Sequence, residues 1–258
     1  MRFPARLHVL LARDAPYAVI LRRGPARLVC TIGWDRANDT FQIGQWLRGR
    51  IYEQRCDLSP DGRHLLYFAL NGRWASETKG SYTAVSLAPY LKAIALYPQG
   101  HTWGGGGVFL SNTTYNVYAG GASLRESGSL SRVATHRWIG GPLAARLERD
   151  GWTPASSDEA SYELPVPHGR SLRLTLRSGI PPAPGRGCHW EEFALVHHAA
   201  GRVHPLPGCD WAGLDGSRLV WTTAGTLNAA RLTKRGLGLV TLLADLNPLQ
   251  FERLQAPY

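Results

Sequence analysis

The sequence lacks any apolar stretch long enough to cross a membrane, since a spanning helix needs about 20 such residues in a row. Its N-terminus also lacks the pattern of a secretory signal. Arg2 and Arg6 precede a short apolar segment, but Arg13 and Asp14 interrupt that segment at once. We therefore expect a cytoplasmic protein that does not enter the membrane.

Cysteine is scarce, and none of the four cysteines forms a C-x-x-C pair. Two of them, Cys56 and Cys209, occupy equivalent positions of an internal repeat, where a small buried apolar residue is expected. A free buried cysteine packs as a small hydrophobe. The sequence therefore predicts reduced thiols in a reducing compartment rather than a disulfide framework.

Several chemical motifs are missing. The four glycines at residues 104–107 are not followed by Lys and Ser or Thr, so they do not form a phosphate loop. There is no G-x-S-x-G sequence and no nucleophile with an identifiable base. A histidine-rich segment lies near two cysteines and an acid, but His197 and His198 are adjacent, and adjacent residues of a strand point to opposite faces. We predict no metal site and no cofactor.

The chain is organised around one stretch that occurs twice, at residues 56–68 and 209–221. Each copy reads as a short strand, an Asp-Gly turn and an apolar strand. Glycine adopts positive φ without a steric penalty, and aspartate bonds to its own backbone, so the pair favours a tight turn. Residues 101–110 are interpreted as a third, degenerate copy in which Gly106 and Gly107 replace Asp-Gly.

Marker residues recur near Cys56, Trp103, Tyr162 and Cys209, at spacings of roughly 45–55 residues, which is close to the length of a propeller blade. A unit of this length holds about four short strands, and neighbouring sheets can bury its faces. The predicted fold is all-β: a single β-propeller-like domain of about five four-stranded blades over residues 1–258. One short helix is expected near residues 142–150, ended by a glycine.

The segment Leu58-Ser59-Pro60-Asp61-Gly62-Arg63-His64-Leu65-Leu66-Tyr67 resembles the repeat of TolB-like and WD40-like β-propellers, in which SPDG forms a turn between blade strands. The second copy matches more loosely, because it lacks Ser-Pro. The resemblance implies a propeller with a protein-binding or ligand-binding role. It carries over no catalytic residues.

Carboxylates offer one route to catalysis, because some five-bladed propellers are glycoside hydrolases with paired carboxylates in a central funnel. The candidates in this chain are Asp35, Asp57, Glu191 and Asp210. Asp57 and Asp210 repeat with the fold, however, and a repeated aspartate is explained by hydrogen bonds to turn amides. We favour this structural interpretation and expect a protein that is not an enzyme.

Tryptophan is abundant, with nine residues. Most are expected to pack in the core and between blades. Trp34, Trp74 and Trp103 fall in predicted loops and, with Arg73, form a candidate recognition surface, because aromatic residues and arginine dominate protein interfaces.

The formal net charge is +10, carried almost wholly by arginine. Such a charge is compatible with a nucleic-acid partner, but no basic run exceeds two residues, so a nucleic acid is possible and not favoured. The leading hypothesis is a non-enzymatic scaffold or interaction module that binds a protein partner. A propeller glycoside hydrolase is the alternative, and a nucleic-acid-binding protein is the weaker one.

Overall fold

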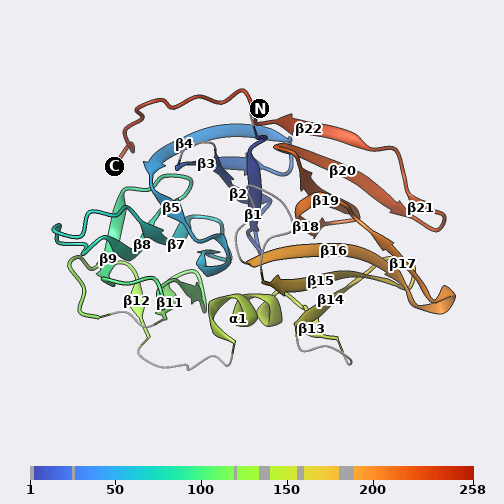
Figure 1. The fold of residues 1–258 in the computed structure, drawn as a ribbon, viewed down its shortest axis with the longest axis horizontal. Helices are drawn as coiled ribbons and strands as arrows, with labels where there is room; N and C mark the ends of the chain where they lie inside the picture. Colours follow the sequence, from blue (N-terminus) through green and yellow to red (C-terminus); the bar gives the residue numbers. More distant parts are fainter. Residues whose placement is uncertain (1–2, 25–26, 119–120, 134–139, 156–159, 180–188) are drawn as a thin grey trace. The chain divides into compact units, whose positions relative to one another are not determined.

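The structure is a computed structural model that describes residues 3–24, 27–118, 121–133, 140–155, 160–179 and 189–258. It is all-β, with five sheets and one α-helix in the described residues (Figure 1). The predicted fold class is confirmed: the sheets follow one another along the chain, as the blades of a propeller do. The chain divides into two compact units. The larger unit holds His8–Arg146 and Gln250–Tyr258, and the smaller unit holds Met1–Leu7 and Leu147–Leu249.

The larger unit contains three sheets. The first has the order β1-β2-β3-β4, and its strands are Arg6–Leu11, Tyr17–Arg23, Leu28–Asp35 and Thr40–Arg48. The second is built around β7, β8 and β9, with β5 and β6 both paired to β7; its elements are β5 (Arg50–Ile51), a 3-10 turn η1 (Glu53–Arg55), β6 (Asp57–Leu58), β7 (His64–Leu70), β8 (Ser81–Leu87) and β9 (Ala93–Pro98). The third has β10 (Gly107–Phe109), β11 (Thr114–Val117) and β12 (Ser131–Arg132).

The smaller unit contains two sheets. The fourth sheet has the order β13-β14-β15-β16-β17, with strands Thr153–Pro154, Ser161–Val166, Arg170–Ser178, His189–His197 and Arg202–Pro205, and a 3-10 turn η2 at His198–Ala200. The fifth contains β18 (Cys209–Asp215), β19 (Arg218–Thr223), β20 (Thr226–Thr233), β21 (Gly236–Leu237) and β22 (Thr241–Asp245). Arg170 joins the two sheets, because its guanidinium donates to the carbonyls of Thr233 and Lys234.

The helix α1 spans Gly141–Arg149, which confirms the predicted helix to within one residue at each end. Gly151 follows it at φ +86° and donates its amide to the carbonyl of Glu148. A glycine in this conformation ends a helix without a steric penalty. No helix among the described residues has both the length and the apolar character that crossing a bilayer requires.

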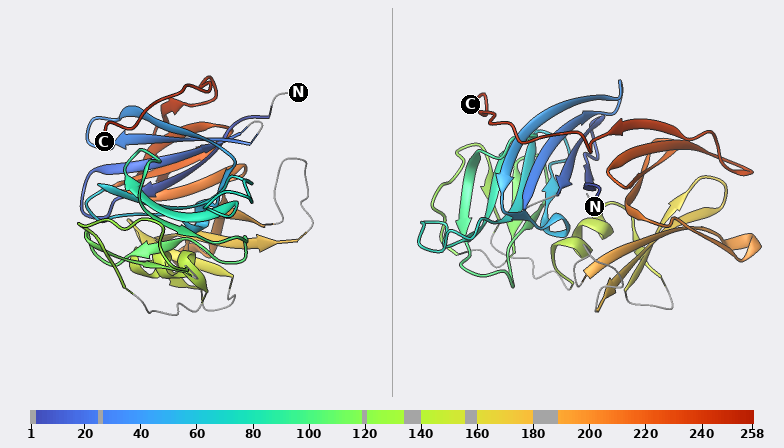
Figure 2. Two further views of the ribbon diagram at one scale, coloured as in Figure 1. Left: turned by 90° about the vertical axis from the view of Figure 1, so that its left-hand side faces the viewer. Right: turned by 45° about the horizontal axis from the view of Figure 1, so that its top comes forward.

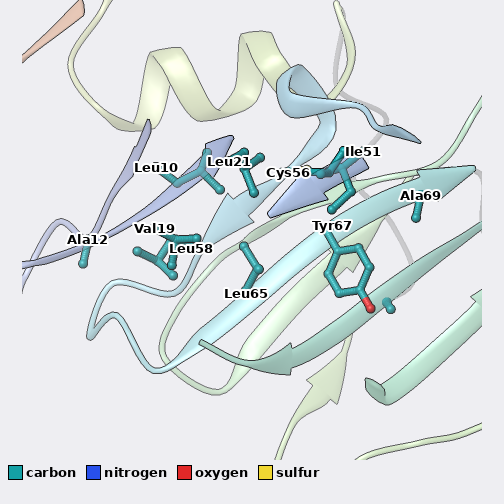
Figure 3. Packing of buried hydrophobic residues seen from close by; sticks show 12 residues of the cluster. Leu10, Ala12, Val19, Leu21, Ile51, Cys56, Leu58, Leu65, Tyr67 and Ala69 are labelled. Carbon is teal, nitrogen blue, oxygen red and sulfur yellow. The ribbon is translucent and has the colours of Figure 1, made fainter. Parts of the chain in front are cut away.

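Buried apolar side chains join neighbouring sheets of the larger unit. One cluster combines Leu10, Val19 and Leu21 of the first sheet with Leu65 and Tyr67 of the second (Figure 3). A second cluster joins the second sheet to the third through residues that include Leu66, Val85, Phe109 and Tyr115. Each sheet thus covers the apolar face of the next, which is the arrangement that the repeat predicts.

The repeated turn has the predicted geometry in both copies. Gly62 has φ +76° and Gly216 has φ +58°. In the first copy the Ser59 hydroxyl donates to Asp61 at 2.6 Å and accepts from the His64 amide at 2.9 Å, so the SPDG turn closes on itself. The sequence supplies the whole turn locally, which explains why the motif could be identified without the structure.

The proposed third copy is wrong. Gly106 precedes β10 and Gly107 is its first residue, so this pair does not form the turn between β10 and β11. The two glycines are required for another reason: a Cβ on Gly106 would meet the Arg55 carbonyl, and one on Gly107 would meet the Asn116 carbonyl. A looser copy of the turn lies between β14 and β15, within residues 165–174, where His168 and Gly169 take the place of Asp-Gly and both have positive φ, +68° and +67°.

The C-terminal tail of the larger unit, residues 250–258, runs along β4 (Figures 1 and 2). Gln45 on β4 donates its side-chain amide to the Leu254 carbonyl, and Phe251 packs edge-on against Trp46. Tyr258 ends the tail by donating its hydroxyl to the Lys92 carbonyl at 2.7 Å. The tail thereby joins the outer strand of the first sheet to the β8–β9 connection of the second.

Candidate functional site

Two loops at the same end of the second sheet carry the exposed aromatic residues. The β7–β8 loop spans residues 71–80 and the β9–β10 loop spans residues 99–106. Antiparallel pairing of Leu70 with Ser81, and of Tyr82 with Pro98, places both loops at one edge. The Gln99 amide also donates to the Ser81 carbonyl at 2.9 Å. We call the surface made by these loops together with Arg27, Arg48, Gly49 and Arg50 the strand-end surface.

Trp103 is 90% exposed and Trp74 is 58% exposed. Both lie in loops, as the sequence predicts. Large apolar side chains exposed to this extent in two neighbouring loops are typical of interaction sites, because exposure keeps their hydrophobic area in contact with water. The structure therefore leaves these two indoles available to a partner.

The loops that present the indoles are tightly hydrogen-bonded. The Trp74 ring lies against Gly80, where φ is +80° and an added Cβ would overlap the indole. Both the Asn71 and the Gly72 amides donate to the Gly80 carbonyl at 3.0 Å. In the second loop the Ser81 hydroxyl donates to the His101 carbonyl at 2.7 Å. A fixed aromatic side chain loses little conformational entropy when it binds.

Arg73, the fourth predicted binding residue, is exposed beside Trp74. Four further exposed cations accompany it on the strand-end surface: Arg27, Arg48, Arg50 and Lys79. The segments that carry these cations are adjacent in space. The Gly49 amide donates to the Arg27 carbonyl, and Gly49 itself lies against Leu70 and Asn71. The predicted residue thus belongs to a larger basic surface that spans the first and second sheets.

Trp34 does not belong to this surface, and its assignment to a loop is wrong. It lies in β3 and is 0% exposed. Its indole N–H donates to the Asp39 carboxylate at 3.1 Å, and its ring stacks on Phe41. The strand extends one residue beyond Trp34 before the turn at residues 36–39 begins, so the side chain enters the core.

The two candidate carboxylates of the larger unit are held by hydrogen bonds. Asp57 is 1% exposed, and its Oδ2 accepts from the Phe109 amide at 2.7 Å. Asp35 accepts from the Asn38 side chain and the Ala37 amide, and these two bonds lower its pKa. Asp57 therefore fixes the third sheet to the second, whereas Asp35 closes its own turn. The interpretation from the sequence expects such an aspartate to bind a turn amide of its own blade, whereas the bond from Phe109 joins Asp57 to the neighbouring sheet.

The other two candidates lie in the smaller unit. Asp210 pairs with Arg6 at 3.3 Å, with both side chains partly exposed. Glu191 lies on β16, and its charge contributes to raising the pKa of the Cys209 thiol, an effect dominated by burial. Asp210 follows the repeated cysteine as Asp57 does. Both aspartates accept a hydrogen bond from the chain outside their own sheet, which is a structural role.

Sequence reasoning missed a polar cluster on the fourth sheet. The Ser171 hydroxyl donates to Glu163 Oε2 at 2.7 Å and lies 2.9 Å from His198 Nε2. The Ser171 hydroxyl has one proton, and it donates that proton to the carboxylate. In the contact with His198 the hydroxyl oxygen is therefore the acceptor, and Nε2 is the protonated donor. A protonated nitrogen cannot act as the base for that serine. Arg173 also binds Glu163, at 2.7 Å, so the cluster is structural.

The histidine-rich segment does not assemble a metal site within the part of the chain that the structure describes. No group of three or more His, Cys, Asp or Glu side chains there could hold a metal ion. His198, for example, lies in η2 and is committed to Glu163 and Ser171. Cys188, one member of the predicted segment, is outside the described residues.

Comparisons with known proteins give no family for this chain. No protein-family model matches the sequence, and no curated protein matches it.

Solved structures similar to it include three proteins. The GH43 BlXynB protein from Bacillus licheniformis is 12% identical with a TM-score of 0.38, and the match covers 99% of this chain and 60% of that one. Hydrazine synthase from Kuenenia stuttgartiensis is 10% identical with a TM-score of 0.33, covering 90% and 78%. The β-propeller domain of the trilobed protease from Pyrococcus furiosus is 9% identical with a TM-score of 0.28, covering 96% and 83%.

The chain thus spans about three fifths of the GH43 protein (60%). At these identities and TM-scores the likenesses assign no activity.

Proposed function

We propose that this protein is a non-enzymatic interaction module that binds a protein partner through the strand-end surface, with Trp74 and Trp103 as its anchors. The role is of the kind that TolB-like and WD40-like propellers provide. The observation that supports it most strongly is the exposure of Trp103, at 90%, together with a second exposed indole in the neighbouring loop. Interface energy is concentrated in a few aromatic and arginine residues, and Arg73 lies next to Trp74.

Rigidity supports the same proposal. The loops are closed by hydrogen bonds on both sides of each indole, so the recognition residues are held in place before binding. Three of the four candidate carboxylates, Asp35, Asp57 and Asp210, have in contrast a structural hydrogen-bond or ion-pair partner. A hydrolase would need a general acid and a base or nucleophile, and the lowered pKa of Asp35 makes that residue unsuited to be the acid.

Affinity purification from the native source, followed by mass spectrometry, tests the proposal. The W74A/W103A double variant should lose a partner that the unchanged protein retains. Leu239→Ala is the matched control, because Leu239 is 91% exposed and lies in the smaller unit. Equal recovery of every partner by W74A/W103A and by the unchanged protein would refute the proposal, provided that thermal unfolding shows both to be folded.

A further inference from the structure

The strand-end surface is strongly asymmetric in charge. Five exposed cations lie on it: Arg27, Arg48, Arg50, Arg73 and Lys79. The described residues of its loops contribute one exposed acid, Glu77. A second acid nearby, Glu53, is already paired with Arg23 at 3.2 Å. Such a surface attracts a partner of opposite charge and disfavours one of like charge.

Two of the arginines lie over aromatic rings. The Arg50 guanidinium carbon is 4.4 Å from the centroid of Tyr52, and that of Arg48 is 5.5 Å from the centroid of Phe251. A cation over a ring is held there by electrostatic attraction, and the N–H donors of a guanidinium form a fork that matches a carboxylate. Both arginines are exposed, so the rings limit their freedom without burying them.

The strand-end surface offers fewer aromatic rings on which a base could stack than it offers arginine guanidinium groups. The Tyr52 ring has both Arg50 and Arg55 over it, and Phe68 is fully buried. The Trp74 ring lies against the backbone at Gly80. Proteins that bind single-stranded nucleic acid stack successive bases on a series of aromatic side chains. This surface offers two indoles and a row of forks, which suits carboxylates and apolar side chains better than consecutive bases.

From these observations we propose that the partner docks with an extended acidic polypeptide segment, whose carboxylates bind Arg48, Arg50 and Arg73 and whose apolar side chains contact Trp74 and Trp103. This inference rests on the proposed function and specifies the chemistry of its partner. A guanidinium binds a carboxylate with two parallel hydrogen bonds, which orient the carboxylate and add geometric specificity to the attraction of opposite charges.

Fluorescence anisotropy tests the inference with three labelled probes. The first is a twelve-residue peptide in which Glu alternates with Leu, the second carries Gln in place of Glu, and the third is a twelve-nucleotide poly(U) RNA. The Glu peptide should bind at least about tenfold more tightly than the Gln peptide, because each lost charged contact weakens binding. Equal affinity for the two peptides, or tighter binding of poly(U), would overturn the proposal.

Variants locate the binding. R48A/R50A/R73A should weaken the Glu peptide by about tenfold or more, and R48K/R50K/R73K should weaken it by a smaller factor of about threefold, because lysine keeps the charge and loses the fork. The control R202A/R231A/R235A removes the same charge from exposed residues of the smaller unit and should bind as the unchanged protein does. An equal loss in this control would show only nonspecific attraction and refute the site.

The two proposals fail in different ways. If W74A/W103A loses the native partner while R48A/R50A/R73A retains it, the proposal of an interaction module is supported and the proposal of an acidic docking segment is refuted. If W74A/W103A retains every native partner, the interaction module itself is refuted.

Discussion

The guanidinium of Arg55 donates from Nη1 to the carbonyls of Thr102 and Gly104, both at 2.8 Å, and these two residues flank Trp103. Trp103, the most exposed tryptophan among the described residues, is therefore attached to the core through the backbone on either side of it. Arg55 itself lies between aromatic rings, with its Cζ 5.4 Å from Tyr52 and 5.3 Å from Phe68. One partly buried cation thus positions a residue of the strand-end surface.

Arg55→Lys is expected to loosen the Trp103 loop without unfolding the protein. Lysine keeps the positive charge and has enough N–H donors, but it lacks the planar guanidinium that lies over Tyr52 and Phe68 and fixes the position of Nη1, so the contacts to the two carbonyls should be less well held. Hydrogen exchange at residues 99–106 should become faster, and partner binding should weaken by about tenfold. Mass-spectrometric exchange measures the first effect. Unchanged protection in this loop would show that Arg55 does not hold it.

Asp57→Asn should destabilise the protein by about 2 kcal/mol, because a buried carboxylate that accepts a backbone amide is replaced by a weaker neutral acceptor. Urea unfolding measures this difference. Asp35→Asn is the control, since Asp35 is at the surface and should cost much less. An Asp57→Asn protein of unchanged stability would contradict the structural role assigned here and reopen a catalytic one.

Local signals explain which parts of this fold the sequence reveals. The Asp-Gly turns and the stop at Gly151 depend on residues within a few positions of one another, so pattern alone predicts them. The copy at residues 165–174 was missed because His168 takes the place of aspartate, although Gly169 keeps the positive φ.

Features that depend on strand register could not be found in this way. Glu163 and Ser171 lie on neighbouring strands and meet His198 only after β14, β15 and η2 fold. The burial of Trp34 likewise follows from how far β3 extends. Exposed loop tryptophans were easier to predict, because Trp74 and Trp103 lie among glycines and polar residues.

The three described cysteines are free and buried, and burial raises the pKa of each thiol to about 12. The thiolate is the reactive form, so the native protein should react very slowly with a thiol reagent at these positions. We expect a Cys188→Ser variant to show no rapid thiol reaction while folded and three reactive thiols in denaturant. Fast labelling of the folded variant would show that Cys30, Cys56 or Cys209 is accessible.

Glu163 should make stability depend on acid pH. Burial acts to raise its pKa, but the hydrogen bonds from Ser171 and Arg173 and the charges of Arg173 and His198 outweigh burial and lower it. A carboxyl whose pKa is lower in the folded state contributes stability above its unfolded pKa of about 4.3, and this contribution is lost as the pH falls through the folded pKa. Stability should therefore fall below about pH 4.3.

Comparison of Glu163→Gln with the unchanged protein isolates this effect. The difference in free energy of unfolding should be largest near pH 6 and should shrink toward pH 3, where the carboxylate becomes protonated. Glu192→Gln is the matched control, because the Arg177–Glu192 pair is about half exposed on both sides and exposed pairs contribute little. A difference for Glu163→Gln that is independent of pH would show that the carboxylate is not held by Arg173 and Ser171 in solution.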